Sequence, residues 1–209
     1  MKILYGTTNP SKIKWMKKML EGLDIELLTL NDVKLQLGTI DESGNKPLEN
    51  ARIKALAYYK AAKIPVFSCD SGLYIEGLNE EEQPGVHVRR IHGKTLNDEE
   101  MIEYYSGISR SLGGKAIARY RNAICLVIDE KQIFEYDGEK IASEKYIIAA
   151  KPHKNRDEGF PLNSLSVHIE SGKYYMDIKT PIKEDENEAN AYKEFFMKAL
   201  KRQTEYKVQ

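Results

Sequence analysis

Residues 2–12 read KILYGTTNPSK, a short apolar run that passes through a polar loop into a helical pattern. Lys2 to Tyr5 predicts a buried strand, which the Gly-Thr-Thr-Asn-Pro break ends. Asn9 is a favourable N-cap residue, and Pro10 suits the first position of a helix. Apolar side chains at 13, 16 and 20 share one face of that helix, so a strand–loop–helix unit opens the chain.

Strands and helices continue to alternate after this unit. Further strands are expected at 25–30, 65–68, 117–127, 133–136 and 140–149, and further helices from Pro47 to about Ala62, from Asn97 to Tyr105 and from Asn187 to Arg202. The polar stretch 37–46 reads as an exposed loop, and 129–132 indicates a hairpin. The chain shows no repeat or linker, so one α/β domain over 1–209 is predicted.

Composition narrows the classes of function. The chain has 209 residues, 41% hydrophobic and 31% charged, which is typical of a soluble globular protein. Its 32 basic and 32 acidic residues balance, which disfavours DNA or RNA as the main partner. Its two cysteines favour neither a disulfide scaffold nor a zinc site. No apolar run approaches the ~20 residues of a membrane span, so a cytoplasmic location without membrane contact is expected.

The loop before the first helix is a candidate phosphate site. It offers backbone N–H groups, the hydroxyls of Thr7 and Thr8, and the positive end of a helix dipole. Lys12, in the first turn, could add an ammonium to the same anion. The alternative is an ordinary capped junction with Lys12 in solvent.

Two acidic residues admit a local structural role as well as a functional one. Glu49 is third in its helix, where a carboxylate commonly caps the backbone, but it could also bind a metal. Asp70 follows a buried strand, the place where α/β proteins bind ligands, but it could equally belong to a turn. Gly72 permits either a tight turn or a close backbone approach.

The sequence does not decide the roles of two arginines and one phenylalanine either. Arg89 and Arg90 follow a Pro-Gly turn, where such residues are often merely exposed. Phe160 reads either as core or as a ring that stacks on a base.

Five short motifs, in order, resemble the inosine triphosphate pyrophosphatase family, also called the Ham1-like family, which clears faulty purine nucleotides. They are Thr7-Thr8-Asn9-Pro10-Ser11-Lys12, Glu49-Asn50-Ala51 with Lys54-Ala55, Asp70-Ser71-Gly72-Leu73, Pro84-Gly85-Val86 with Arg90 and Gly93, and Arg121-Asn122-Ala123. Each motif alone is unspecific, but five in this order at suitable spacings are specific. The resemblance covers residues 2–127 and thins beyond them.

The resemblance implies hydrolysis of a nucleoside triphosphate between its α- and β-phosphates. Glu49 would hold a magnesium ion, with manganese as the alternative. Asp70 would share that ion or act as base for the attacking water. The remaining implied site residues are Lys12 and Lys54, in catalysis and substrate binding, and Thr8, Asn9, Ser71, Arg90 and Phe160, in substrate binding.

The resemblance also implies an architecture and an assembly. The fold would be ITPase-like, also described as anticodon-binding-like, with a mixed central sheet flanked by helices and two lobes with a cleft between them. Relatives are usually homodimers, so a homodimer is expected. The expected partner is a nucleoside triphosphate.

Three departures from the family pattern concern the metal and the base. Cys69 stands where the family has a first acidic residue, and Trp15 stands where it has a glutamate. The third departure comprises two segments of the C-terminal half. The usual Gly-Phe-Gly-Tyr-Asp-Pro segment is reduced to 159–163, Gly-Phe-Pro-Leu-Asn. The Ser-His-Arg that reads the purine 6-oxo edge is missing, and the region reads Asn187-Glu188-Ala189 instead. The base is therefore left open.

Three hypotheses follow. The first is a pyrophosphatase for a non-standard, purine-type triphosphate, supported by Lys12, Glu49, Lys54 and Asp70. The second is a nucleotide-binding relative with impaired turnover, supported by Cys69 and the altered C-terminal half. The third is a pyrophosphatase with Maf-like specificity for a different nucleotide.

Overall fold

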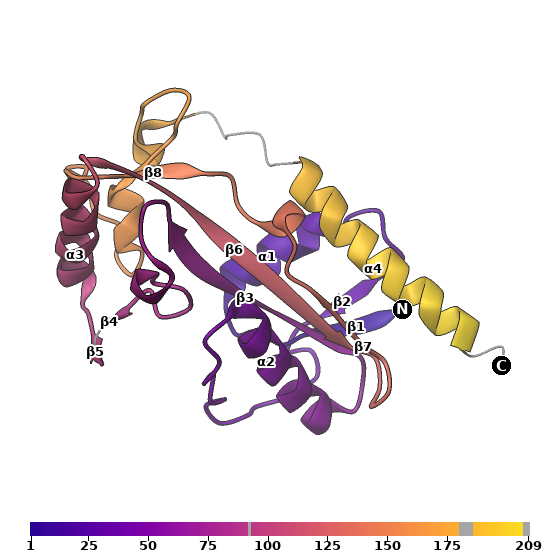
Figure 1. Cartoon of the computed structure of the whole chain (residues 1–209). Helices are drawn as coiled ribbons and strands as arrows, with labels where there is room; N and C mark the ends of the chain where they lie inside the picture. Colours follow the sequence, from indigo (N-terminus) through magenta and orange to yellow (C-terminus); the bar gives the residue numbers. More distant parts are fainter. Residues whose placement is uncertain (92, 180–185, 207–209) are drawn as a thin grey trace. The chain divides into compact units, whose positions relative to one another are not determined.

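The computed structural model describes residues 1–91, 93–179 and 186–206, which form two compact units (Figure 1). The first unit comprises Met1–Ser71, Arg121–Ala142 and the described residues from 186 onwards. The second comprises Gly72–Tyr120 and the described residues from Ser143 to 179. Strands β3 (Val66–Ile75) and β6 (Lys115–Val127) run through both units.

The first unit combines parallel and antiparallel pairing. Besides its parts of β3 and β6 it contains β1 (Lys2–Tyr5), α1 (Pro10–Met19), β2 (Glu26–Leu28), α2 (Pro47–Ala62), β7 (Ile133–Tyr136) and α4 (Glu186–Tyr206). Strand β1 pairs in parallel with β2 and β3, and β6 pairs antiparallel with β7. The α/β class, the mixed sheet and the hairpin are therefore confirmed.

Helices cover both faces of this part of the sheet because side chains alternate along each strand. On one face, β1 contributes Ile3 and Tyr5 to a core shared with α1 and α4. On the other, Leu4 packs with Tyr58 of α2. The same division holds on β6, where Ile124 joins the first core while its neighbours on either side pack against the alanines of α2.

The second unit packs α3 (Asp98–Ser111) on a separate core. Its further elements are the β4–β5 hairpin (Arg90–Ile91 and Lys94–Thr95), β8 (Tyr146–Ala149), β9 (Ser166–Val167) and a 3-10 turn at Pro161–Ser164. Asn97 and Glu100 form the expected capping box of α3. No helix within the described ranges is both long and apolar enough to cross a membrane.

The turn that was one reading of Asp70–Leu73 does not form, because β3 continues to Ile75. Leu73 and Gly85 exchange both backbone hydrogen bonds, at 2.9 and 3.0 Å. A Cβ on Gly72 would lie 3.0 Å from the carbonyl carbon of Gly85. Gly72 therefore serves a close backbone approach, the other of its two readings, and Asp70 lies within a strand instead of at its end.

Other bounds also differ from expectation. The helix predicted to end at Tyr105 runs on to Ser111, because its apolar positions continue to contact the core of the second unit. The strand expected at 140–149 is a 3-10 turn at Glu139–Ile141 followed by β8. The strand expected at 25–30 is reduced to β2.

Candidate functional site

The loop between β1 and α1 uses most of its amides internally. Asn9 Oδ1 accepts hydrogen bonds from the amides of Ser11, at 2.9 Å, and Lys12, at 3.2 Å, which confirms Asn9 as the N-cap. Thr7 Oγ1 accepts from the Asn9 amide at 3.2 Å. The amides of Gly6 and Thr7 donate to the carbonyls of Phe67 and Tyr5. The expectation of several free amides for a phosphate is thus wrong, because the cap and these carbonyls satisfy them. Exposed Thr8 and half-buried Lys12 remain as donors to an anion.

An ion triad links α2 to β3. Lys54 Nζ lies 2.7 Å from Asp70 Oδ1 and 2.8 Å from Glu42 Oε2. The side chains of Lys54 and Asp70 are only 12% and 13% exposed. Burial alone would lower the pKa of Lys54, but the two carboxylates outweigh it and raise that pKa above 10.5. Two predicted site residues are therefore in direct contact, as a charged pair.

Glu42 is a candidate site residue that the sequence did not reveal, because it pairs with Lys54. It is half-buried in the segment 37–46, which was expected to be merely an exposed loop. Glu49 caps α2: its Oε2 accepts from the amides of Asn45, at 2.7 Å, and Lys46, at 3.3 Å. The capping reading of Glu49 is thereby confirmed, and its role as a metal ligand stays a prediction.

Cys69 does not replace the charge of the acidic residue that the family pattern has there. Burial raises the pKa of its thiol to about 12, although its hydrogen bond with Tyr5 and the charges of Lys12 and Lys54 act in the opposite direction. The thiol is therefore neutral at neutral pH. The electrostatic influence of both lysines on one thiol also brings Lys12 and Lys54 to the same region of the first unit.

The two departures at positions 15 and 69 pack against the same core, which includes Tyr192 of α4. The Trp15 ring packs edge-on against Tyr192, with ring centroids 5.2 Å apart. Burial, and to a smaller extent Cys69, raises the pKa of the Tyr192 hydroxyl, and Cys69 packs against the same core. An apolar and aromatic cluster thus stands where the family pattern has two acidic side chains.

Ser71 points away from the ion triad. Its hydroxyl donates to Asn122 Oδ1 at 2.7 Å. The Asn122 amide donates to the Ile141 carbonyl at 2.7 Å and to Glu188 Oε1 at 3.2 Å. Asn122 therefore ties β3 to the beginning of α4. Only its place in the Arg-x-Ala motif pointed to it in the sequence.

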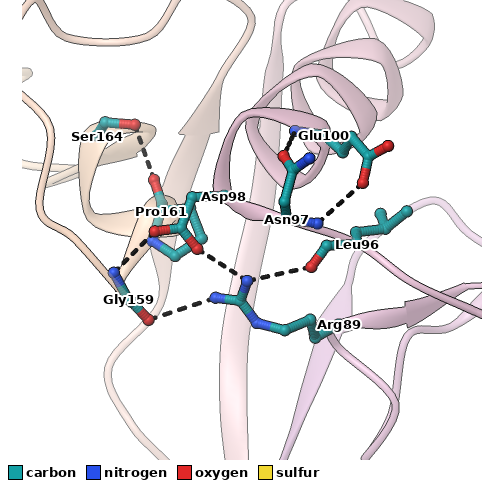
Figure 2. A network of polar contacts seen from close by, with 8 residues as sticks. All are labelled: Arg89, Leu96, Asn97, Asp98, Glu100, Gly159, Pro161 and Ser164. Atoms are coloured by element: carbon teal, nitrogen blue, oxygen red, sulfur yellow. Dashed lines mark hydrogen bonds and ion pairs between the residues drawn. The ribbon is translucent and has the colours of Figure 1, made fainter.

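Arg90 and Phe160 belong to the second unit. Arg90 is exposed at the start of β4, as one reading of this residue had it. The Phe160 side chain is 56% exposed, so its reading as core is wrong. Arg89, by contrast, is not merely exposed, because it is hydrogen-bonded to Leu96 and Asp98 (Figure 2).

The donor chemistry of the triad suits a hard divalent cation. Carboxylate oxygens are preferred magnesium ligands, and magnesium sites typically combine one or two protein carboxylates with substrate phosphates. Glu42 and Asp70 place two carboxylates on a single ammonium, so both lie close together. In the part of the chain that the structure describes, no group of three or more His, Cys, Asp or Glu forms a complete protein cage.

Comparisons with known proteins agree with one another. A family model described as "Ham1 family" matches residues 3–154. The dITP/XTP pyrophosphatase of Leptospira interrogans is 34% identical over 143 residues, 68% of this chain and 70% of that protein. The one of Thermus thermophilus is 30% identical over 178 residues, 85% and 81% of the two chains.

Solved structures give the same result for the fold. The HAM1 protein of Coxiella burnetii matches with a TM-score of 0.66 at 24% identity, over 91% of this chain and 90% of that one. The Ham1 protein of Staphylococcus aureus matches with a TM-score of 0.68 at 22% identity, over 94% and 98%.

Proposed function

The chain belongs to the Ham1 family, and on this basis we propose that it hydrolyses a nucleoside triphosphate to the monophosphate and pyrophosphate. Relatives named dITP/XTP pyrophosphatase support a non-standard purine triphosphate as the substrate. The observation that carries the proposal is the buried Lys54 ammonium between Asp70 and Glu42, with Lys12 in the same region.

The chain's own residues provide charge and a base. Lys12 and Lys54 neutralise the triphosphate, and the exposed Thr8 hydroxyl and the side-chain NH₂ group of Asn9 orient it at the start of α1. Asp70, oriented by Lys54, accepts a proton from a water whose oxygen attacks the α-phosphorus. The bond from that phosphorus to the bridging oxygen breaks, and pyrophosphate leaves with the bonding electrons.

Magnesium, with manganese as the alternative, supplies charge neutralisation and activation of water when it is bound. Asp70 and Glu42 are the residues that would hold it. Glu49 could join them through Oε1, because its cap contacts with Asn45 and Lys46 both use Oε2. Substrate binding by Ser71 and Arg90 is part of the same proposal, as are a homodimer and a cytoplasmic location.

Phe160 is the candidate contact to the base. A phenyl ring exposed to this degree offers a flat apolar face, and stacking on such a face accepts any base. The selectivity for a particular base must then come from other groups, because the missing Ser-His-Arg motif cannot supply it.

The neutral Cys69 thiol favours one second candidate, a nucleotide-binding relative with impaired turnover. Cys69→Asp would restore the missing carboxylate. A large gain in pyrophosphate release, with Cys69→Ser as control, would support impairment. An unchanged rate would show that Cys69 is compatible with full activity.

The test is pyrophosphate release with magnesium from a panel of standard, deaminated and pyrimidine triphosphates. Asp70→Asn should abolish release, whereas Asp41→Asn, an exposed acidic residue beside Glu42, should not. Preference for a pyrimidine would indicate Maf-like specificity. Nucleotide binding without release from any triphosphate would leave only the impaired relative.

A further inference from the structure

Three residues that are distant in sequence form a closed hydrogen-bonded ring in the second unit (Figure 2). Asp98 uses both carboxylate oxygens: Oδ1 accepts from Arg89 Nη1 at 2.8 Å, and Oδ2 accepts from the Gly159 amide at 2.7 Å. Arg89 Nη2 completes the ring by donating to the Gly159 carbonyl at 3.4 Å. The amide and the carbonyl of one glycine are thus held by one ion pair, which we call the Gly159 clamp.

Gly159 has a backbone conformation that depends on the absence of a side chain. Its φ angle is +80°, in the left-handed region that other residues rarely adopt. No atom lies within 4 Å of where its Cβ would be, so the backbone angle, and not crowding, requires glycine. The clamp therefore fixes a position where the chain turns sharply into Phe160.

The backbone around Phe160 is also held from its other side. The Phe160 amide donates to the Asp157 carbonyl at 2.9 Å, and Pro161 after it is buried. Ser164 Oγ then donates to the Pro161 carbonyl at 2.7 Å, closing the 3-10 turn. Phe160 is consequently an exposed ring on a fixed backbone, although water is an unfavourable environment for that ring.

We propose that Arg89 and Asp98 are positioning residues, which fix Phe160 so that its ring stacks on the base of the nucleotide. The proposal rests on the proposed function. A ring held in its binding geometry loses little conformational entropy on stacking, so clamping strengthens nucleotide binding without any contact to the ligand. The Arg89–Asp98 pair is only half-buried, and ion pairs that remain partly in solvent contribute little to overall stability, so the clamp acts mainly on the loop.

The fork of arginine is needed for this arrangement. Arg89 donates to acceptors from three places: Asp98, the Leu96 carbonyl at 3.1 Å and the Gly159 carbonyl. A lysine ammonium at the end of a flexible chain cannot reproduce this planar geometry. Arg89→Lys should therefore keep the charge but rescue only part of the effect.

The experiment compares Arg89→Ala with Lys94→Ala in the full chain. Lys94 also pairs with the first turn of α3, through Glu100, and is a matched control. For release of pyrophosphate from inosine triphosphate, Arg89→Ala should raise KM about fivefold or more with kcat changed less than about twofold. Lys94→Ala should change neither, and the Tm values of both variants should stay close to that of the wild type.

The Phe160→Leu variant then shows whether Arg89 acts by positioning Phe160 or weakens nucleotide binding in some other way. If the clamp acts through Phe160, Arg89→Ala should have no further effect on KM in the Phe160→Leu background. An equal effect of Arg89→Ala with and without Phe160, or no effect at all, would overturn the proposal.

Direct binding of inosine triphosphate, measured calorimetrically, keeps the two proposals distinct. If the wild type binds the nucleotide but releases no pyrophosphate, the proposed function fails. The clamp can still be judged from the same double-mutant comparison made on Kd. If Arg89→Ala weakens binding only when Phe160 is present, the clamp is supported. If Arg89→Ala leaves Kd unchanged, the clamp is overturned.

Discussion

Lys54 Nζ and Asp70 Oδ1 lie 2.7 Å apart, and both side chains are almost fully enclosed by protein. They are on different elements, α2 and β3, so the pair joins two parts of the first unit. An enclosed charge that loses its partner is left poorly solvated, which makes such a pair sensitive to the removal of either member.

Lys54→Met is expected to reduce kcat/KM for pyrophosphate release about a hundredfold or more, because a cation that neutralises the triphosphate is lost. It should also lower the free energy of unfolding by about 1–3 kcal/mol, since Asp70 loses a charged hydrogen bond. Steady-state kinetics and urea unfolding measure the two effects. Lys60→Met, at an exposed position on the same helix, is the control, and an equal loss in both variants would contradict the prediction.

Glu42→Gln tests the carboxylate that the sequence did not reveal. It keeps the size of the side chain and removes its charge, so kcat/KM should fall about tenfold and saturation should need more magnesium. The measurement is pyrophosphate release as a function of magnesium concentration. Asp41→Asn should leave that curve unchanged, and a Glu42→Gln curve that superimposes on the wild type would remove Glu42 from the site.

The Asp98 carboxyl should titrate below its ordinary pKa of 3.8, because the Gly159 amide, and then Arg89, favour the charged form. The stabilisation that this pKa difference provides is present above the pKa of Asp98 in the unfolded chain. It is lost as pH falls through the lower pKa of Asp98 in the folded protein. Carboxyl chemical shifts in NMR should place the midpoint below 3.8. Arg89→Ala should move it part of the way back, and leave unchanged the lowered pKa of Glu100, whose first cause is Lys94.

Stability at alkaline pH should report the burial of Cys69. Its folded pKa of about 12 exceeds the ordinary value of 9.0, so the unfolded chain loses the proton first as pH rises. The contribution is fully present below pH 9 and is lost towards pH 12. Between these values Cys69→Ala should make the decline in unfolding free energy shallower by about 1.4 kcal/mol per pH unit.

Val127→Ala provides the control for this slope. It also removes buried apolar volume but carries no titrating group, so it should shift the stability curve without changing its slope. Parallel curves for Cys69→Ala and the wild type would show that the thiol titrates normally.

Features set by neighbours in the sequence could be predicted. Asn9 and Pro10 start α1, and Asn97 with Glu100 starts α3, because capping depends only on residues within one turn. The exposed hairpin between β6 and β7 could be predicted for the same reason, from the polar residues 129–132. These local signals were sufficient for the α/β class and for the order of most elements.

Features set by distant partners could not be predicted from local pattern. A turn stayed one of the two readings of Asp70 because the pairing of Leu73 with Gly85 lies outside any local window. Glu42 read as a loop residue because its partner, Lys54, lies on the following helix. Arg89 was assigned no partner, since the acceptor at Gly159 is 70 positions away.

Strand β3 presents successive side chains to opposite helices. Asp70 meets α2 through Lys54, whereas Cys69 and Ser71 look towards the core and polar contacts of α4. A substitution on the α4 side therefore removes no hydrogen bond of the charged pair on the α2 side, and acts on that pair only through a change of charge. Trp15 and Cys69, the two positions where the family pattern has acidic residues, both pack against that core, whereas the charged pair lies on the other side of β3.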